Sequence, residues 1–250
     1  MALLKVLDGT DVKKANKLID DGCDLNMQNE EGETALMLAI NLHFIKFKSG
    51  RGFNNGAWKE SINDLINKLI DKKCDLHLKD KKGDIALMYS IRAHLETISI
   101  KIIDNMDNHY LNSVNSYNMR PLTIAVLCNN IIIVKKLINA KSDINVITEQ
   151  SLLDACCVKR DMNVIPDTEC MDILIDEFIN RKDVCFLENV KGDISKIINH
   201  IHKNKKVDKI WKLYDEQFIE ILNEDNILAL CFKNNLGDKN VIDLLIKYII

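Results

Sequence analysis

The feature that most constrains the fold is a helix–turn–helix segment that recurs along the chain. Its best-preserved copy spans residues 115–145 and reads NSYNMRPLTIAVLCNNIIIVKKLINAKSDIN. The run from Arg120 to Ala125 is predicted to open one helix, and the apolar spacing of Ile132 to Ile138 predicts a second. A unit of two short helices cannot bury its own apolar face, so the chain is expected to fold by stacking neighbouring copies.

The same pattern occurs twice earlier in the chain. These copies begin at Asn29 and Asp80, with the sequences NEEGETALMLA and DKKGDIALM. Gly32 and Gly83 stand where the turn needs a positive φ, which glycine adopts without strain. Asn118 occupies this position in the copy at 115–145, and asparagine also tolerates the left-handed conformation. The three copies therefore share one register.

The first 27 residues are interpreted as an opening repeat. Asp11 is placed to cap a helix from Val12 to Ile19, and Gly22 follows the end of that helix. In the next repeat, Thr34 can cap the first helix by accepting a backbone N–H. An end repeat covers the core on one side only, which explains why its sequence is less regular.

These starts resemble the ankyrin repeat, which has a period of about 33 residues and opens with T-P-L-H-x-A. In the second repeat, TALMLA follows that pattern with Ala35 in place of proline and Met37 in place of histidine. The match is clear over residues 10–145. The resemblance implies an all-α solenoid of stacked helix–turn–helix pairs with short projecting turns. We therefore predict one ankyrin-repeat domain over residues 1–250, with about six or seven repeats that are degenerate over 146–250.

Beyond residue 145 the helical pattern continues with less regular spacing. Residues 150–157 and 169–179 are predicted as the two helices of a fifth repeat, with a loop at 158–168 between them. Residues 183–201 are predicted to form an eroded sixth pair. The end of the chain, residues 210–250, is predicted to form a capping repeat.

Residues 43–60 interrupt the second repeat. Equivalent turn cysteines, Cys23 and Cys74, lie 51 positions apart, so about 18 residues are inserted relative to the period of about 33. The inserted sequence, HFIKFKSGRGFNNGAWKE, is predicted to contain a loop because it holds three of the nine glycines.

The aromatic residues of this insertion have two interpretations. They could extend the flanking helices and pack on the side of the solenoid, which we favour for Phe44 and Phe47. They could also dock on a partner or stack on unpaired bases, and Phe53 and Trp58 are left as candidate partner contacts.

Composition excludes several classes of function. The formal net charge of -3 argues against a dedicated nucleic-acid binder, and no run of about 18 apolar residues predicts a membrane span. The first residues contain too few apolar side chains to form the core of a signal peptide. The eight cysteines are scattered along the sequence without C-x-x-C pairs. We predict reduced, mostly buried thiols in a cytoplasmic protein. The abundance of Ile, Asn and Lys suggests an AT-rich genome such as that of a large DNA virus or a protist.

No catalytic or metal-binding constellation is found. His200 and His202 are two residues apart and cannot both face one metal ion, and the adjacent Cys156 and Cys157 have the same difficulty. The sequence contains neither G-x-S-x-G nor H-E-x-x-H. We predict a protein that is not an enzyme and that needs no cofactor or metal.

The resemblance implies a protein partner held in a concave groove. In that family the partner meets the turn residues, the residue between the Gly and Thr positions, and the end of the first helix. Carried onto this sequence, these positions and the two insertion residues give the predicted contacts Glu30, Glu31, Glu33, Leu42, Lys81, Lys82, Asp84, Arg92, Tyr117, Met119, Leu127, Phe53 and Trp58. The groove would run from an acidic end through a basic middle to an apolar patch, although exposed turn charges can also be merely solvated.

Two alternatives remain open beside a monomeric interaction scaffold that binds a host protein. Asn26 and Asn145 lie in turns that resemble those modified by asparagine hydroxylation in ankyrin proteins, so the chain could be a substrate. Residues 214–222, YDEQFIEIL, faintly resemble an F-box-like region, so the chain could be a ubiquitin-ligase substrate adaptor.

Overall fold

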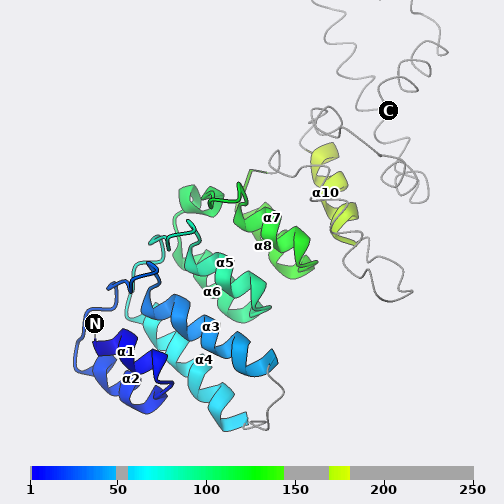
Figure 1. Cartoon of the computed structure of the whole chain (residues 1–250). Helices are drawn as coiled ribbons and strands as arrows, with labels where there is room; N and C mark the ends of the chain where they lie inside the picture. Colours follow the sequence, from blue (N-terminus) through cyan, green and yellow to red (C-terminus); the bar gives the residue numbers. More distant parts are fainter. Residues whose placement is uncertain (1, 49–55, 144–168, 181–250) are drawn as a thin grey trace, which may run out of the picture. The chain divides into compact units, whose positions relative to one another are not determined.

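Within residues 2–143, the helices are arranged as four consecutive pairs joined by short turns (Figure 1). The structure, a computed structural model, describes residues 2–48, 56–143 and 169–180. The chain divides into two compact units, residues 1–146 and 147–250. The helices described in the first unit are α1 (Ala2–Asp8), α2 (Val12–Asp20), α3 (Ala35–Lys48), α4 (Gly56–Asp71), α5 (Ala86–Arg92), α6 (Glu96–Asn105), α7 (Pro121–Leu127) and α8 (Ile131–Asn139), with a 3-10 helix at Asn108–Asn112.

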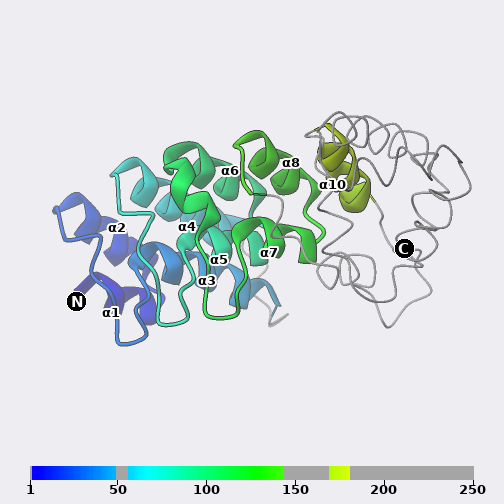
Figure 2. The ribbon, with the colours of Figure 1, turned by 90° about the horizontal axis from the view of Figure 1, so that it is seen from above.

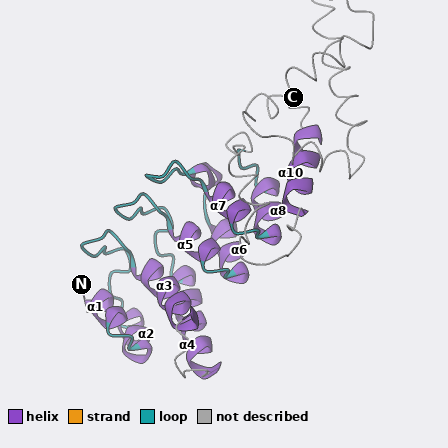
Figure 3. Ribbon diagram, turned by 45° about the vertical axis from the view of Figure 1, so that its right-hand side comes forward, coloured by secondary structure: helices purple, strands orange, loops and turns teal. Residues whose placement is uncertain are grey.

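The pairs of the first unit stack into two rows. The first helices α1, α3, α5 and α7 pack against one another, and α2, α4, α6 and α8 form the second row (Figure 2). Hairpin turns project from the stack between successive pairs, as Figure 3 shows. In the described residues the only β feature is an isolated bridge between Gln28 and Thr34. The predicted all-α solenoid of helix pairs is therefore confirmed.

The local signals read from the sequence act as predicted. Asp11 caps α2 by accepting the backbone N–H of Lys14 at 3.0 Å. The hydroxyl of Thr34 accepts the N–H of Met37 at 3.3 Å at the start of α3. Asn118 has a φ of 56°, so it takes the left-handed conformation that glycine adopts in the other repeats.

The core lies between the two rows of helices. Equivalent leucines of the first helices, Leu36, Leu87 and Leu122, are each at most 1% exposed. Leu69 from α4 and Leu137 from α8 contribute fully buried side chains from the second row. Each repeat therefore completes its core only with its neighbours, as the stacking argument requires.

The insertion at 43–60 is helical at both ends. Helix α3 continues to Lys48 and α4 begins at Gly56, so much of the insertion lengthens the second helix pair. The extension is held by packing, because His43 is buried and Phe44 is half-buried. Our expectation that Phe44 and Phe47 extend α3 is confirmed, whereas residues 49–55 lie outside the described residues.

The second unit is described only over α10 (Glu169–Asn180), where Cys170 and Leu174 are buried. This agrees with the helix predicted at 169–179. The other elements predicted after residue 145 lie outside the described residues, and the single domain of about six or seven repeats stays a prediction.

Candidate partner-binding face

The turns between helix pairs are built in the same way in the second, third and fourth repeats. At each turn, one side-chain oxygen of Asn29, Asp80 or Asn115 accepts hydrogen bonds from the backbone N–H groups two and four residues later. The six N···O distances range from 2.8 to 3.0 Å. Each side chain thus fixes the path of its own hairpin, so the residues at the tip are presented on a defined backbone.

Neighbouring hairpins contact one another through backbone atoms. The N–H of Lys81 donates to the carbonyl of Glu31 at 2.9 Å, and the N–H of Ser116 donates to the carbonyl of Lys82 at 2.8 Å. A Cβ atom on Gly32 would lie 2.9 Å from the nitrogen of Lys81. Glycine at position 32 therefore allows both the positive φ of the turn and the close approach of the Lys81 backbone.

We call the hairpin face the surface formed by the tips of these three hairpins. It consists of Glu30, Glu31, Lys81, Lys82, Ser116 and Tyr117. All six residues are exposed, and Tyr117 is the most exposed large apolar side chain among the described residues, at 63%. The predicted tip contacts are therefore brought together on one surface.

The predicted charge gradient contains an ion pair between neighbouring hairpins. The ammonium of Lys81 lies 3.9 Å from a carboxylate oxygen of Glu31, and both side chains are well exposed. Exposed pairs of this kind contribute about 0–1 kcal/mol, so the two charges stay available to a partner. Behind them, Glu33 is half-buried and accepts a hydrogen bond from the amide of Asn29 at 2.9 Å.

Asp84 does not face a partner as predicted. It is only 4% exposed, and its two carboxylate oxygens accept bonds from the two terminal nitrogens of Arg92 at 2.7 and 3.0 Å. The amide of Asn115 also donates to Asp84, at 2.8 Å. This carboxylate therefore joins the third repeat to the fourth, because a buried charge needs a partner. Arg92 keeps 35% of its side chain exposed, but its charge is balanced by Asp84.

Tyr89 is a residue of this region that the sequence analysis missed. Its hydroxyl donates to Asp80 at 2.7 Å and also lies 3.3 Å from a carboxylate oxygen of Glu33. Burial, followed by the hydrogen bond to Asp80, raises the pKa of Tyr89 above its ordinary value. The equivalent positions in the first helices of the neighbouring repeats hold the buried apolar residues Leu38 and Ile124. A tyrosine at such a position could have indicated a hydrogen bond, because a buried phenol needs an acceptor.

The remaining predicted contacts lie behind the tips. Leu42, Met119 and Leu127 are half-buried, so each offers part of an apolar side chain to the surface. Trp58 is half-buried in α4, while Phe53 lies outside the described residues.

Comparison with known proteins identifies this arrangement. A family model described as ankyrin repeats, in three copies, matches residues 56–148. Among solved structures, the chain is similar to the crystal structure of EF0377, an ankyrin repeat protein, with a TM-score of 0.53 and 20% sequence identity. The alignment covers 74% of this chain and 83% of that chain. Residues 56–148 therefore carry ankyrin repeats. No curated protein matches the sequence.

Ankyrin repeats generally act as protein–protein interaction modules and are typically non-enzymatic. Among the described residues, no group of three or more His, Cys, Asp or Glu side chains is arranged to hold a metal ion. Within the same ranges, no helix is long and apolar enough to cross a membrane.

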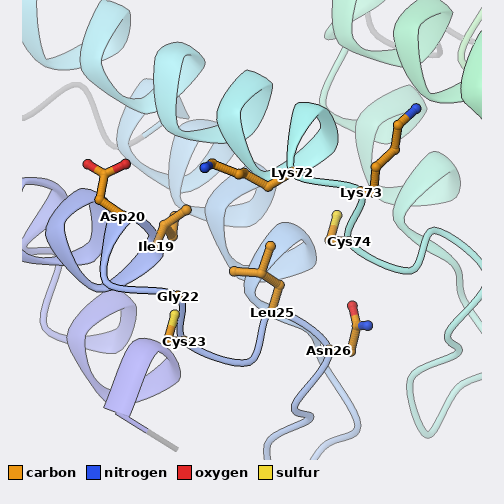
Figure 4. A pocket seen from close by; sticks show the side chains of 9 residues that line it. All are labelled: Ile19, Asp20, Gly22, Cys23, Leu25, Asn26, Lys72, Lys73 and Cys74. Atoms are coloured by element: carbon orange, nitrogen blue, oxygen red, sulfur yellow. The ribbon is translucent and has the colours of Figure 1, made fainter.

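One cavity lies between the first two ankyrin repeats, away from the hairpin tips. Its volume is about 310 Å³, and Figure 4 shows its lining. Lys73 points away from the other lining side chains, and its ammonium lies 3.4 Å from the amide oxygen of Asn105. Burial raises the pKa of Cys74 to about 12, so this thiol stays protonated at neutral pH. The lining residues are Ile19, Asp20, Gly22, Cys23, Leu25, Asn26, Lys72, Lys73 and Cys74.

The thiols of the first unit fit a packing role. Cys74 is buried and Cys23 is half-buried at the equivalent turn of the previous repeat. Burial raises the pKa of Cys23 and also that of Cys128, at the end of α7. A raised pKa makes each thiol a weaker nucleophile, which supports the interpretation of these cysteines as structural residues.

Proposed function

We propose that this protein is a non-enzymatic interaction scaffold that binds a protein partner through the hairpin face and the adjoining ends of the first helices. The observation that supports the proposal is that backbone atoms join the hairpin tips while the tip side chains remain exposed. The backbones are joined to one another by hydrogen bonds, and the exposed Lys81–Glu31 pair adds little, so the tip side chains contribute little to holding the hairpins together. A preorganised surface of this kind loses little conformational entropy on binding.

The composition of the face supports a specific protein partner. Glu30, the Glu31–Lys81 pair, Lys82 and Tyr117 follow one another from the second repeat to the fourth. Mixed charge favours one orientation of a partner over the other, and an aromatic side chain commonly supplies much of the affinity. Half-buried Leu42, Leu127 and Met119 would add apolar contact behind the tips.

The test is affinity capture from lysate with the full chain as bait. One variant combines Lys81→Glu, Lys82→Glu and Tyr117→Ala on the hairpin face. The matched control combines Lys13→Glu, Lys14→Glu and Ile132→Ala, which are exposed positions on the second-helix row. We expect the hairpin variant to lose a partner that the control retains, while both melt like the original chain. Retention of every partner by the hairpin variant would remove the proposal and direct attention to residues 43–60 or to the second unit.

The alternative functions stay predictions. The side-chain oxygen of Asn26 accepts the N–H of Asp75 at 2.7 Å, so hydroxylation there would modify a residue that links the first repeat to the second. A mass increase on the peptide that contains Asn26 would support it. Asn145 and the F-box-like residues 214–222 lie outside the described residues. The monomeric state, the cytoplasmic location and a source in a virus or protist also stay predictions.

A further inference from the structure

Where the hairpin of the third repeat meets the hairpin of the fourth, a cation lies next to an exposed aromatic side chain. The hydrogen bond from the N–H of Ser116 to the carbonyl of Lys82, at 2.8 Å, brings Lys82 beside Ser116 and its neighbour Tyr117. Both Lys82 and Tyr117 are exposed, so their side chains share one part of the hairpin face.

Lys82 differs from Lys81, Arg92 and Arg120 because no carboxylate of the described residues pairs with its charge. Lys81 lies near Glu31, Arg92 is paired with Asp84, and Arg120 lies 2.9 Å from Asp143. Over residues 2–48, 56–143 and 169–180, no carboxylate lies within ion-pair distance of the Lys82 ammonium. The unpaired charge in this part of the hairpin face is therefore positive.

The apolar surface in this part of the hairpin face comes from one repeat. Tyr117 at the tip, Met119 at the base of the hairpin and Leu127 at the end of α7 all belong to the fourth repeat, and Met119 and Leu127 are partly exposed. Aromatic and thioether side chains give a large contact area and adapt to the shape of a partner. A ligand that covered this strip would remove apolar surface from water while its charged group stayed near Lys82.

We propose that the hairpin face recognises an extended peptide in which a carboxylate lies next to an apolar side chain. The carboxylate lies over Lys82, and the apolar side chain packs against Tyr117 and Met119. This inference rests on the proposed function and adds the chemistry of the partner. A basic peptide would meet the unpaired Lys82, and a nucleic acid would meet Glu30 and Glu31 on the same face, so charge complementarity disfavours both.

The experiment uses a displayed library of short random peptides selected on the full chain. We expect the enriched peptides to carry Asp or Glu beside an aromatic or aliphatic residue. A synthetic peptide of the enriched sequence should bind Lys82→Glu and Tyr117→Ala each about tenfold or more weakly than the original chain. Changing the peptide's acidic residue to Lys should restore binding to Lys82→Glu and abolish it for the original chain.

Two control variants separate the site from general surface effects. Lys13→Glu changes an exposed cation on α2, and Ile132→Ala removes an exposed apolar side chain on α8. Both should bind the peptide like the original chain. The inference would be overturned by enrichment of basic peptides, by no enrichment, or by a peptide that binds Lys82→Glu normally.

The remaining outcome concerns a second copy of the chain as occupant. Self-association of the original chain in sedimentation, together with its loss in Lys82→Glu, would overturn the inference and indicate that a second copy of the chain occupies the face. A lysate partner that depends on the hairpin face, together with peptides indifferent to Lys82, would keep the proposed function and remove only the acidic–apolar chemistry. A lysate partner indifferent to the hairpin variant would instead remove the proposed function itself.

Discussion

The two sides of the same repeats are held together by different atoms. On the second-helix row, a lysine of each repeat forms an ion pair with an aspartate of the repeat before it. These pairs are Lys68–Asp20 at 2.8 Å, Lys101–Asp71 at 2.8 Å and Lys136–Asp104 at 2.6 Å. On the hairpin side, the only ion pair between described tip residues is the looser Lys81–Glu31 contact. There the hairpin tips are joined by backbone hydrogen bonds, and buried side chains behind them, such as Asn115 on Asp84, also link the repeats.

This difference explains how one fold can hold a variable binding surface. Where side chains join the repeats, their identity is tied to stability. Where backbone atoms join them, the tip side chains can change without loss of the contact, provided that the glycine beside it is kept. Substitutions should therefore separate the two sides, and the expected effects follow from the largest to the smallest.

The largest effect is expected in the core, which serves both sides. Leu87 is 0% exposed in the third repeat, so Leu87→Ala should lower the free energy of unfolding by about 2–5 kcal/mol and weaken both neighbours. Urea unfolding, monitored with two different probes of folding, measures the loss of unfolding free energy. The control is Leu18→Ala on α2, where the leucine is half-buried and the loss should be smaller. An unchanged midpoint for Leu87→Ala would show that the repeat register is wrong.

The next effect tests the backbone contact between hairpins. Gly22 and Gly32 both have a φ of 79°, so an added Cβ strains each by about 1–2 kcal/mol. In the described part of the chain, no heavy atom would lie within 4 Å of a Cβ on Gly22, whereas a Cβ on Gly32 would meet the backbone nitrogen of Lys81. Gly32→Ala should therefore destabilise the protein more than Gly22→Ala in matched thermal or urea unfolding. Equal losses would mean that the hairpins can move apart freely.

A pH-dependent effect is expected in the lengthened helices. His43 is buried, and neither ring nitrogen has a hydrogen-bond partner among the residues that the structure describes. Burial, followed by the charge of Lys59, lowers the pKa of His43 below 6.5. The unfolded state then binds more protons, so stability is lost as the pH falls from about 6.5 towards the native pKa.

His43→Leu should flatten this loss without lowering stability at neutral pH, because the leucine needs no hydrogen bond. Urea unfolding at a series of pH values measures the slope. The control, His109→Gln, changes an exposed histidine and should leave the slope as it was. A slope that persists in His43→Leu would assign the pH dependence to other groups.

Much of the fold could be predicted because its signals are local. The cap at Asp11 and the positive φ of Asn118 depend on residues close in sequence, and both were read correctly. The lengthening of α3 through Phe44 and Phe47 was also expected, whereas the burial of His43 within it was not predicted from the sequence.

The site was less predictable because burial at the hairpins is decided between repeats. Asp84 occupies a position that the family pattern assigns to a partner, yet Arg92 and Asn115 enclose it. Arg92 lies eight residues later and was itself predicted to face the partner, so nothing in the sequence pattern paired it with Asp84. Tip positions such as Lys82 were easier, because a turn between two helices is exposed in any arrangement of the stack.

The smallest effects compare the charges of the two sides directly. Lys101→Ala and Asp71→Ala, combined in a double-mutant cycle, should give a coupling of about 0.2–1 kcal/mol that decreases with salt. The cycle is needed because Lys101 also donates to the side chain of Asn67 at 3.1 Å. Lys82→Ala on the hairpin face should change stability by less than about 0.5 kcal/mol at any salt concentration. A comparable loss for Lys82→Ala would mean that the hairpin side also depends on its side-chain charges, and the distinction between the two sides would fail.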